Sequence, residues 1–141
     1  MEYEEQPTFR EQHVLVAAAA NDFQALGLVE ALSALELNVT IADTAERASH
    51  ANEATVCIIV LHPETWQSSP SITTAMNCKP RYMLPVLAEP MLLPDASWTT
   101  DPISINGPLT MIAQAFAALL ARYFEIASES EDASTSIERH S

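Results

Sequence analysis

The side chains best suited to chemistry lie in one stretch, HPETWQSS, which covers residues 62–69 and follows an apolar run. His62 and Glu64 are two residues apart, and an imidazole beside a carboxylate can act as a general acid and base. The simpler interpretation is that both are polar residues at the end of a buried strand. Ser68, Ser69 and Ser71 have no basic residue beside them in the sequence, so we expect them to cap a short helix.

The rest of the chain argues against several other kinds of site. The histidines at positions 13, 50, 62 and 140 form no i, i+4 pair and have no cysteine at metal spacing, so no metal site is predicted. The two glycines, Gly27 and Gly107, are too few and too far apart for a phosphate-binding loop or a nucleophile elbow. No cofactor is therefore expected. A net charge of −13 with only six Lys and Arg residues disfavours nucleic acid and anionic membranes as partners.

The composition indicates one domain. The chain has 141 residues, 48% of them hydrophobic, which is enough to build a core. No apolar run reaches the roughly 18–20 residues of a membrane span, and the acidic start is not a signal peptide. The two cysteines, Cys57 and Cys78, are too few for a disulfide framework, so we expect a cytoplasmic protein. We predict a flexible acidic arm over residues 1–12, a single domain over 13–127 and a disordered acidic tail over 128–141.

Short apolar runs alternate with helical patterns along the chain. Strands are predicted at His13–Ala18, Asn38–Ala42, Thr55–Leu61, Tyr82–Leu87 and, as a short edge strand, Ile103–Ile105. Helices are predicted after Asn21 or Asp22 as N-cap, from Pro70 to about Asn77, and from Leu109 to Ile126. The alternation predicts an α/β fold, a flavodoxin-like three-layer sandwich around a parallel sheet of four to five strands.

The apolar residues of the first and last predicted helices suggest how each helix packs. Helical spacing in the first predicts a buried stripe made of Phe23, Leu26, Val29, Leu32 and Leu35. Gly27, inside that helix, would allow the helix to approach the sheet closely. The last helix has apolar residues on more than one face, a pattern typical of a helix that a second subunit covers, so a homodimer is one possible assembly.

Polar residues should gather at one edge of the sheet, because right-handed connections place the carboxyl ends of parallel strands together. We expect Ala19–Asp22, Asp43, His62–Ser69 and Glu89–Met91 at this edge. Ligands of such folds bind there. Trp66 and Trp98 lie in polar loops and could be either interface anchors or covers over the edge of the core. The candidate cleft or interaction edge therefore comprises Asn21, Asp22, Asp43, His62, Glu64, Trp66, Ser68 and Thr74.

The order of these segments resembles that of a TIR (Toll/interleukin-1 receptor) domain over about residues 13–124. VLVAAAANDF resembles the first strand and polar turn of the family, and CIIVLHPETWQSS resembles its central strand and the loop that follows. RYMLPVLAEPMLLP resembles the strand that ends in Pro-Val, and the helix after INGP resembles the last helix. The resemblance implies a TIR-like sandwich. In many members it also implies cleavage of the nicotinamide–ribose bond of NAD by a glutamate on the helix after the central strand.

Two departures from the family pattern bear on function. Laying the pattern S-x-W-C-x-x-E-L on the chain without gaps puts Ser68 at its serine and Thr74 at its glutamate. A threonine cannot supply the carboxylate that stabilises an oxocarbenium-like charge. Only twelve residues separate Asp43 from Val56, where the family has a longer segment with its BB loop. The resemblance thus implies a catalytically inactive domain that acts in protein–protein association or as a signalling scaffold. The alternative is a nucleotide-binding or NAD-processing domain that uses Glu64 or His62.

A response-regulator receiver is the second resemblance, carried by VLVAAAANDFQALGLVEALSAL. Receivers hold Mg²⁺ with an acidic pair after the first strand, where this chain has three alanines, Ala18 to Ala20. His62 stands where the phospho-acceptor aspartate of a receiver ends the central strand. This second resemblance therefore implies a degenerate receiver that works without phosphate.

Overall fold

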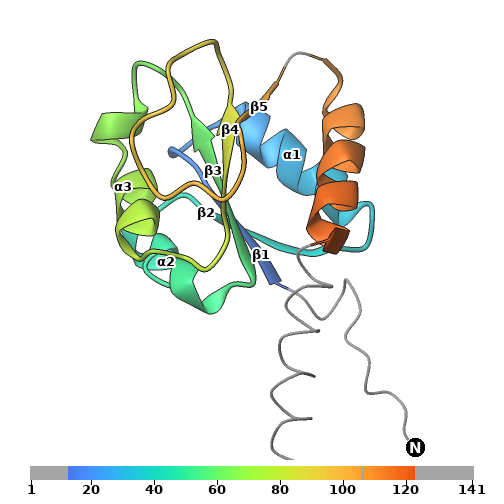
Figure 1. Cartoon of the computed structure of the whole chain (residues 1–141), viewed down its shortest axis with the longest axis horizontal. Coiled ribbons are helices and arrows are strands. Elements are labelled where there is room, and N and C mark those ends of the chain that lie inside the picture. The colour runs from blue at the N-terminus through green and yellow to red at the C-terminus, as the bar shows by residue number, and fades with distance from the viewer. Residues whose placement is uncertain (1–12, 106, 123–141) are drawn as a thin grey trace, which may run out of the picture.

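A computed structural model describes residues 13–105 and 107–122 of the chain (Figure 1). Its core is one sheet of five parallel strands in the order β2-β1-β3-β4-β5, the flavodoxin-like order. The strands are β1 (His13–Ala17), β2 (Asn38–Ala42), β3 (Val56–Leu61), β4 (Met83–Leu87) and β5 (Ile103–Ser104). The predicted fold class and strand number are confirmed, and each strand lies within one residue of its predicted bounds.

The strands form where short apolar, often β-branched runs meet polar residues. β3 is central because all six of its residues are buried and it pairs with β1 on one side and β4 on the other. Side chains alternate across the sheet, so that Val14 and Val16 of β1 face one core and Leu15 and Ala17 face the other. β2, at one edge, buries fewer of its residues.

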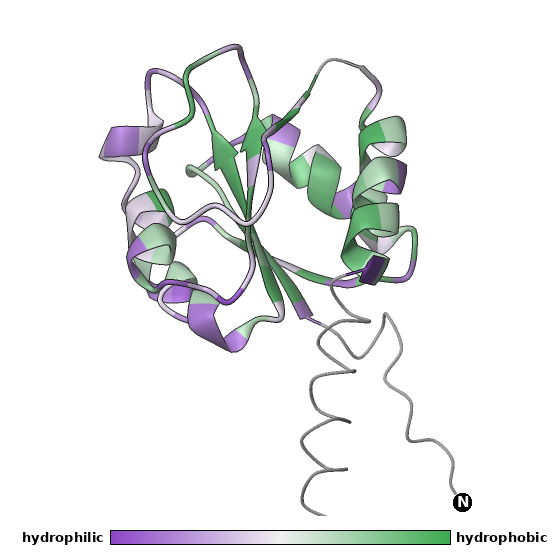
Figure 2. Cartoon of the chain, in the orientation of Figure 1, coloured by the Kyte–Doolittle hydropathy of each residue, from purple (hydrophilic) through white to green (hydrophobic). Residues whose placement is uncertain are grey.

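Helices cover both faces of the sheet and complete three layers (Figure 1). On one face lie α1 (Phe23–Ser33) and the helix that we call the C-terminal helix, described over residues 109–122. On the other face lie α2 (Ala45–Ala48) and α3 (Pro70–Asn77). Two short 3₁₀ turns, η2 (Ala51–Glu53) and η3 (Trp66–Ser68), precede β3 and α3. The hydropathy colouring shows the apolar strands enclosed between the two helical layers (Figure 2).

The buried face of α1 differs from the predicted stripe. Ala25, Leu28 and Leu32 are its buried residues, whereas Phe23 is 80% exposed and Leu26 is 40% exposed. Apolar side chains occur all around this helix, so spacing alone could not tell which side faces the sheet. The prediction that Phe23, Leu26 and Leu35 lie in the core is therefore wrong, since Leu35 is also exposed.

Gly27 allows a close approach, although not to the sheet as predicted. A Cβ atom at Gly27 would lie 2.5 Å from Cδ1 of Leu109, at the start of the C-terminal helix. The missing side chain thus lets α1 and the C-terminal helix pack side by side on the same face.

The connection between β4 and β5, residues 88–102, is fully described and contains no helix. Two hydrogen bonds hold it to the start of β4: Thr99 N–H donates to the Met83 carbonyl, and Met83 N–H donates to Thr99 Oγ1, both at 2.8 Å. Trp98 packs against the second core and donates from Nε1 to the Pro94 carbonyl at 2.7 Å. The segment takes the place that a crossover helix would occupy.

Parts of the predicted domain organisation lie outside the described residues. These are the arm 1–12, the tail 128–141 and residues 123–127 of the predicted domain. None of the helices in the described part of the chain has the length and apolar character that a membrane span requires.

Candidate functional site

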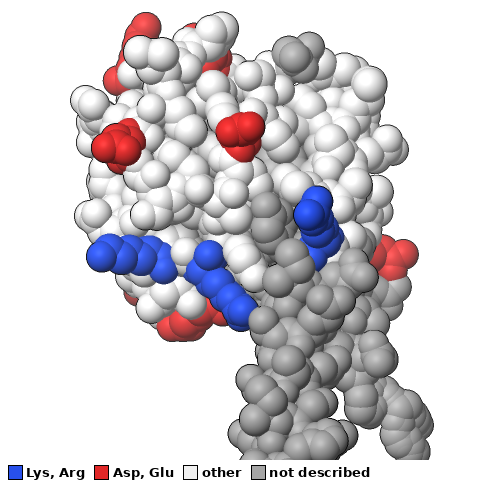
Figure 3. Space-filling model, in the orientation of Figure 1, with Lys and Arg blue, Asp and Glu red and all other residues white. Residues whose placement is uncertain are grey.

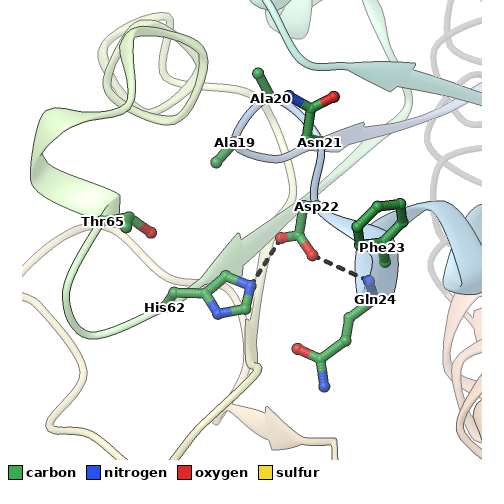
Figure 4. A pocket seen from close by; sticks show the side chains of 8 residues that line it. All are labelled: Ala19, Ala20, Asn21, Asp22, Phe23, Gln24, His62 and Thr65. Carbon is green, nitrogen blue, oxygen red and sulfur yellow. Dashed lines mark hydrogen bonds and ion pairs between the residues drawn. The ribbon is translucent and has the colours of Figure 1, made fainter.

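A pocket of about 370 Å³ lies where the strand order reverses, between the carboxyl ends of β1 and β3 (Figure 4). The connections after these two strands pass to opposite faces of the sheet, which leaves a crevice between them. We call this the switch-point pocket. It is lined by Ala19, Ala20, Asn21, Asp22, Phe23, Gln24, His62 and Thr65.

Asp22 lines the pocket and stands at the N-cap position just before α1. Its side chain is only 4% exposed, and Oδ1 accepts hydrogen bonds from the backbone N–H of Gln24 at 3.1 Å and of Ala25 at 3.2 Å. These bonds satisfy two of the free donors at the start of the helix, which confirms Asp22 as the N-cap. The preceding residue, Asn21, has φ of 62°, a left-handed conformation that asparagine adopts more easily than most residues.

His62 joins three strand ends at this pocket. It follows β3, and its Nε2 lies 2.8 Å from Oδ2 of Asp22, which follows β1 (Figure 4). Its Nδ1 lies 3.5 Å from Oε2 of Glu89, which follows β4. The loop after His62 turns back on itself, because the His62 carbonyl accepts from the N–H groups of Thr65 and Trp66.

This arrangement limits the acid–base chemistry of His62. A neutral imidazole can donate to only one of its two carboxylate neighbours, whereas an imidazolium can donate to both. In catalytic Asp–His pairs the second ring nitrogen faces the nucleophile or the substrate. Here that nitrogen faces Glu89, so His62 connects carboxylates instead of presenting a free nitrogen to the pocket.

The pocket also lacks the usual features of phosphate and metal sites. Among the described residues, no Lys or Arg lines it, so a phosphate would meet carboxylates without a compensating cation. In the same part of the chain, no group of three His, Cys, Asp or Glu side chains is arranged to hold a metal ion.

Two buried serines anchor α3 beside the pocket. Ser71 is 1% exposed, and its hydroxyl donates to the carbonyl of Ala18, at the end of β1. Ser69 lies 3.0 Å from Ser71, measured between the hydroxyl oxygens. Ser69 occupies the N-cap position of α3 but makes no side-chain capping bond. The prediction that these serines cap α3 through their side chains is therefore wrong, because their hydroxyls pair with each other and with β1.

The structure brings together only part of the predicted edge. Asn21, Asp22 and His62 line the pocket. The other predicted residues do not line it. Asp43 pairs with Arg47 at 3.5 Å, and Glu64 is exposed. Trp66 is half-buried against the second core, the Ser68 hydroxyl donates to the Thr65 carbonyl, and Thr74 is half-buried in α3. The carboxylate partners of His62 are Asp22 and Glu89, and Glu64 is not one of them.

Three residues of the site were missed or misplaced by sequence reasoning. Phe23 was assigned to the core by helical spacing, and Thr65, although expected at this edge within residues 62–69, was not singled out as a candidate. Glu89 was expected at the carboxyl edge, and the parallel neighbours β3 and β4 could have suggested that it meets His62. Comparisons with protein-family models, curated protein sequences and solved structures found no match to this chain.

Proposed function

We propose that this chain is a non-catalytic protein-association domain with a TIR-like order of elements, which binds its partner at the rim of the switch-point pocket. The observation that carries this proposal is Phe23, a large aromatic residue that is 80% exposed and lines the pocket. Exposed aromatic side chains beside a pocket and surrounded by polar groups are typical anchors of protein interfaces.

The surroundings of Phe23 support the same proposal. Leu26, one helical turn further along α1, is 40% exposed, and residues three apart on a helix lie on the same side. Asn21 and Gln24 add amide groups around this apolar pair. The combination of an apolar centre and a polar surround is the usual composition of an interface.

Two observations favour association over catalysis. Both ring nitrogens of His62 face carboxylates, and Thr74, at the family's glutamate position, is half-buried in α3 and does not line the pocket. We therefore expect no release of nicotinamide when the protein is incubated with NAD. The strand order suits TIR-like and receiver-like proteins equally, so it does not choose between the two resemblances. A cytoplasmic location and a homodimer stay predictions.

A matched pair of variants tests the proposal. Phe23→Ser removes the exposed aromatic residue of the pocket, while Leu92→Ser removes a residue that is 92% exposed and outside the pocket lining. Light scattering at high concentration would report self-association, and pull-down would report another partner. We expect Phe23→Ser to weaken the association by tenfold or more, since an anchor residue contributes about 2 kcal/mol. Leu92→Ser should leave it unchanged.

Two results would contradict the proposal. One is a wild-type protein that stays strictly monomeric and recovers no partner. The other is an equal effect of Phe23→Ser and Leu92→Ser, because it would show that general surface hydrophobicity, and not the pocket, drives the association.

A further inference from the structure

We propose that a groove between α1 and the start of the C-terminal helix binds an amphipathic helix of the partner protein, one that carries Lys or Arg beside its apolar stripe. The groove has a volume of about 440 Å³, and we call it the helix groove. It is lined by Gly27, Glu30, Ala31, Pro108, Leu109 and Thr110. The inference rests on the proposed function, because it names the kind of segment that the partner presents.

The shape of the groove follows from one close contact between its two walls. A Cβ atom at Gly27 would lie 2.5 Å from Cδ1 of Leu109, so the missing side chain makes room for this leucine. Gly27, Ala31 and Leu109 are only half-buried. Because the distance between packed helices depends on the side chains at the contact, the two small residues of α1 allow a further helix to approach closely.

The apolar side of α1 connects the groove with Phe23. Phe23, Gly27 and Ala31 are four residues apart, so they lie on one side of the helix and span about 12 Å along its axis. Phe23 is 80% exposed and Leu26, beside it, is 40% exposed. A helix with apolar residues at i, i+4 and i+7 can contact such a surface along its whole length. The α1 wall is the middle of a helix, whose backbone groups bond within the helix, so an extended strand finds no ladder to join.

The charge of the groove favours a cationic partner helix. Of the residues that line the groove only Glu30 is charged; it is exposed and has no ion pair within the described part of the chain. On the face drawn in Figure 3 the Lys and Arg side chains lie in the lower half, away from the start of the C-terminal helix at the top. An unpaired carboxylate beside an apolar surface is complementary to a partner that brings a positive charge to it.

A second copy of the chain fits the groove less well. The chain has a net charge of −13, so two copies repel each other. The α1 helix of a second copy would also bring its own Glu30 to the groove, and α1 contains no Lys or Arg to offset it. Like charges that face each other across an interface weaken association. We therefore infer that the helix belongs to a different protein.

Three peptides of about 16 residues test the inference, since shorter isolated helices are marginal in water. The first has Leu at i, i+4, i+7 and i+11, with Lys and Ala elsewhere. The second has the same composition in an order that forms no helical stripe, and the third has Glu in place of each Lys. Each is titrated into the ¹⁵N-labelled full-length protein while the backbone amide signals of Gly27, Glu30 and Ala31 are followed. We expect the first peptide to shift these signals and the other two to bind at least fivefold more weakly.

Two matched pairs of variants locate the binding. Glu30→Gln removes the carboxylate of the groove and should weaken binding of the first peptide severalfold, whereas Glu53→Gln, at an exposed glutamate outside the groove lining, should leave it unchanged. Ala31→Trp fills the groove and should abolish binding. Ala118→Trp, at an exposed position of the C-terminal helix outside the groove lining, should not. The spectra of the free variants check folding, and the conservative Glu30→Gln keeps the test decisive if Ala31→Trp does not fold.

The outcomes separate this inference from the proposed function. No shift with the first peptide, equal binding of the second or third, or unchanged binding by Glu30→Gln overturns the inference. Self-association that shifts the same signals and that Ala31→Trp abolishes also overturns it, because the groove then binds a second copy. If Phe23→Ser weakens association in any of these cases and Leu92→Ser does not, the proposed function stands. If the first peptide binds as expected but Phe23→Ser leaves association unchanged, the helix groove stands and the proposed interface is wrong.

Discussion

Asp22 combines two structural roles, and substitutions that separate them provide the most direct test of the site. Through Oδ1 it caps α1, and through Oδ2 it bonds His62 at 2.8 Å. Asp22→Asn keeps the capping ability, because asparagine is as good an N-cap as aspartate, but it removes the charge that faces His62. Asp22→Ala removes both interactions.

The expected losses of unfolding free energy follow from these contacts. Loss of the N-cap costs about 1 kcal/mol, within a range of about 0.5–2. A hydrogen bond to a charged group contributes about 1.5–3 kcal/mol, against about 0.5–1.5 for a neutral one. The His62 side chain is 21% exposed, so the lower half of the charged range applies. We therefore expect Asp22→Asn to cost about 1 kcal/mol and Asp22→Ala about 3 kcal/mol.

Urea unfolding followed by circular dichroism measures both losses, provided that the slope m stays the same in all variants. A double-mutant cycle with His62→Gln isolates the pair, and we expect a coupling free energy of about 1 kcal/mol or more. Equal losses for Asp22→Asn and Asp22→Ala would refute the capping role. Strictly additive effects in the cycle would refute the contribution of the Asp22–His62 bond.

Two further predictions concern groups whose pKa is shifted by burial. Burial lowers the pKa of His13, so the unfolded chain binds this proton more readily than the folded one. Above pH 6.5, the ordinary pKa of histidine being about 6.5, the difference in unfolding free energy between wild type and His13→Gln should be constant. As the pH falls below that value, the unfolding free energy of wild type should decrease relative to that of His13→Gln. Urea unfolding at a series of pH values measures this difference. Parallel pH profiles would contradict this. Burial, with a smaller effect of Cys78, raises the pKa of Cys57 to about 12. Iodoacetamide should therefore modify only half-buried Cys78 in the native protein and both cysteines after unfolding, as mass spectrometry of the peptides would show.

Much of the sheet could be predicted from the sequence, because the strands are short apolar runs bounded by polar residues. β2 and α3 have the predicted bounds, and the N-cap of α1 was identified from a polar pair before an apolar segment. Such features depend on neighbours along the chain. The direction of the buried face of α1 was not predictable in this way, because apolar residues surround this helix and only its packing on the sheet selects Leu28 and Leu32 over Phe23.

The residues of the site also separate into features that follow from neighbours along the chain and contacts that depend on the fold. The order of residues along the chain predicts which polar residues follow each strand and that parallel strands bring them to one edge. The fold is needed to see that His62 meets Asp22, 40 residues away, and Glu89, 27 residues away, while Glu64 at two residues does not. Strand order places the ends of β1 and β4 on either side of β3, and this spatial order, which no local pattern encodes, determines which charges interact.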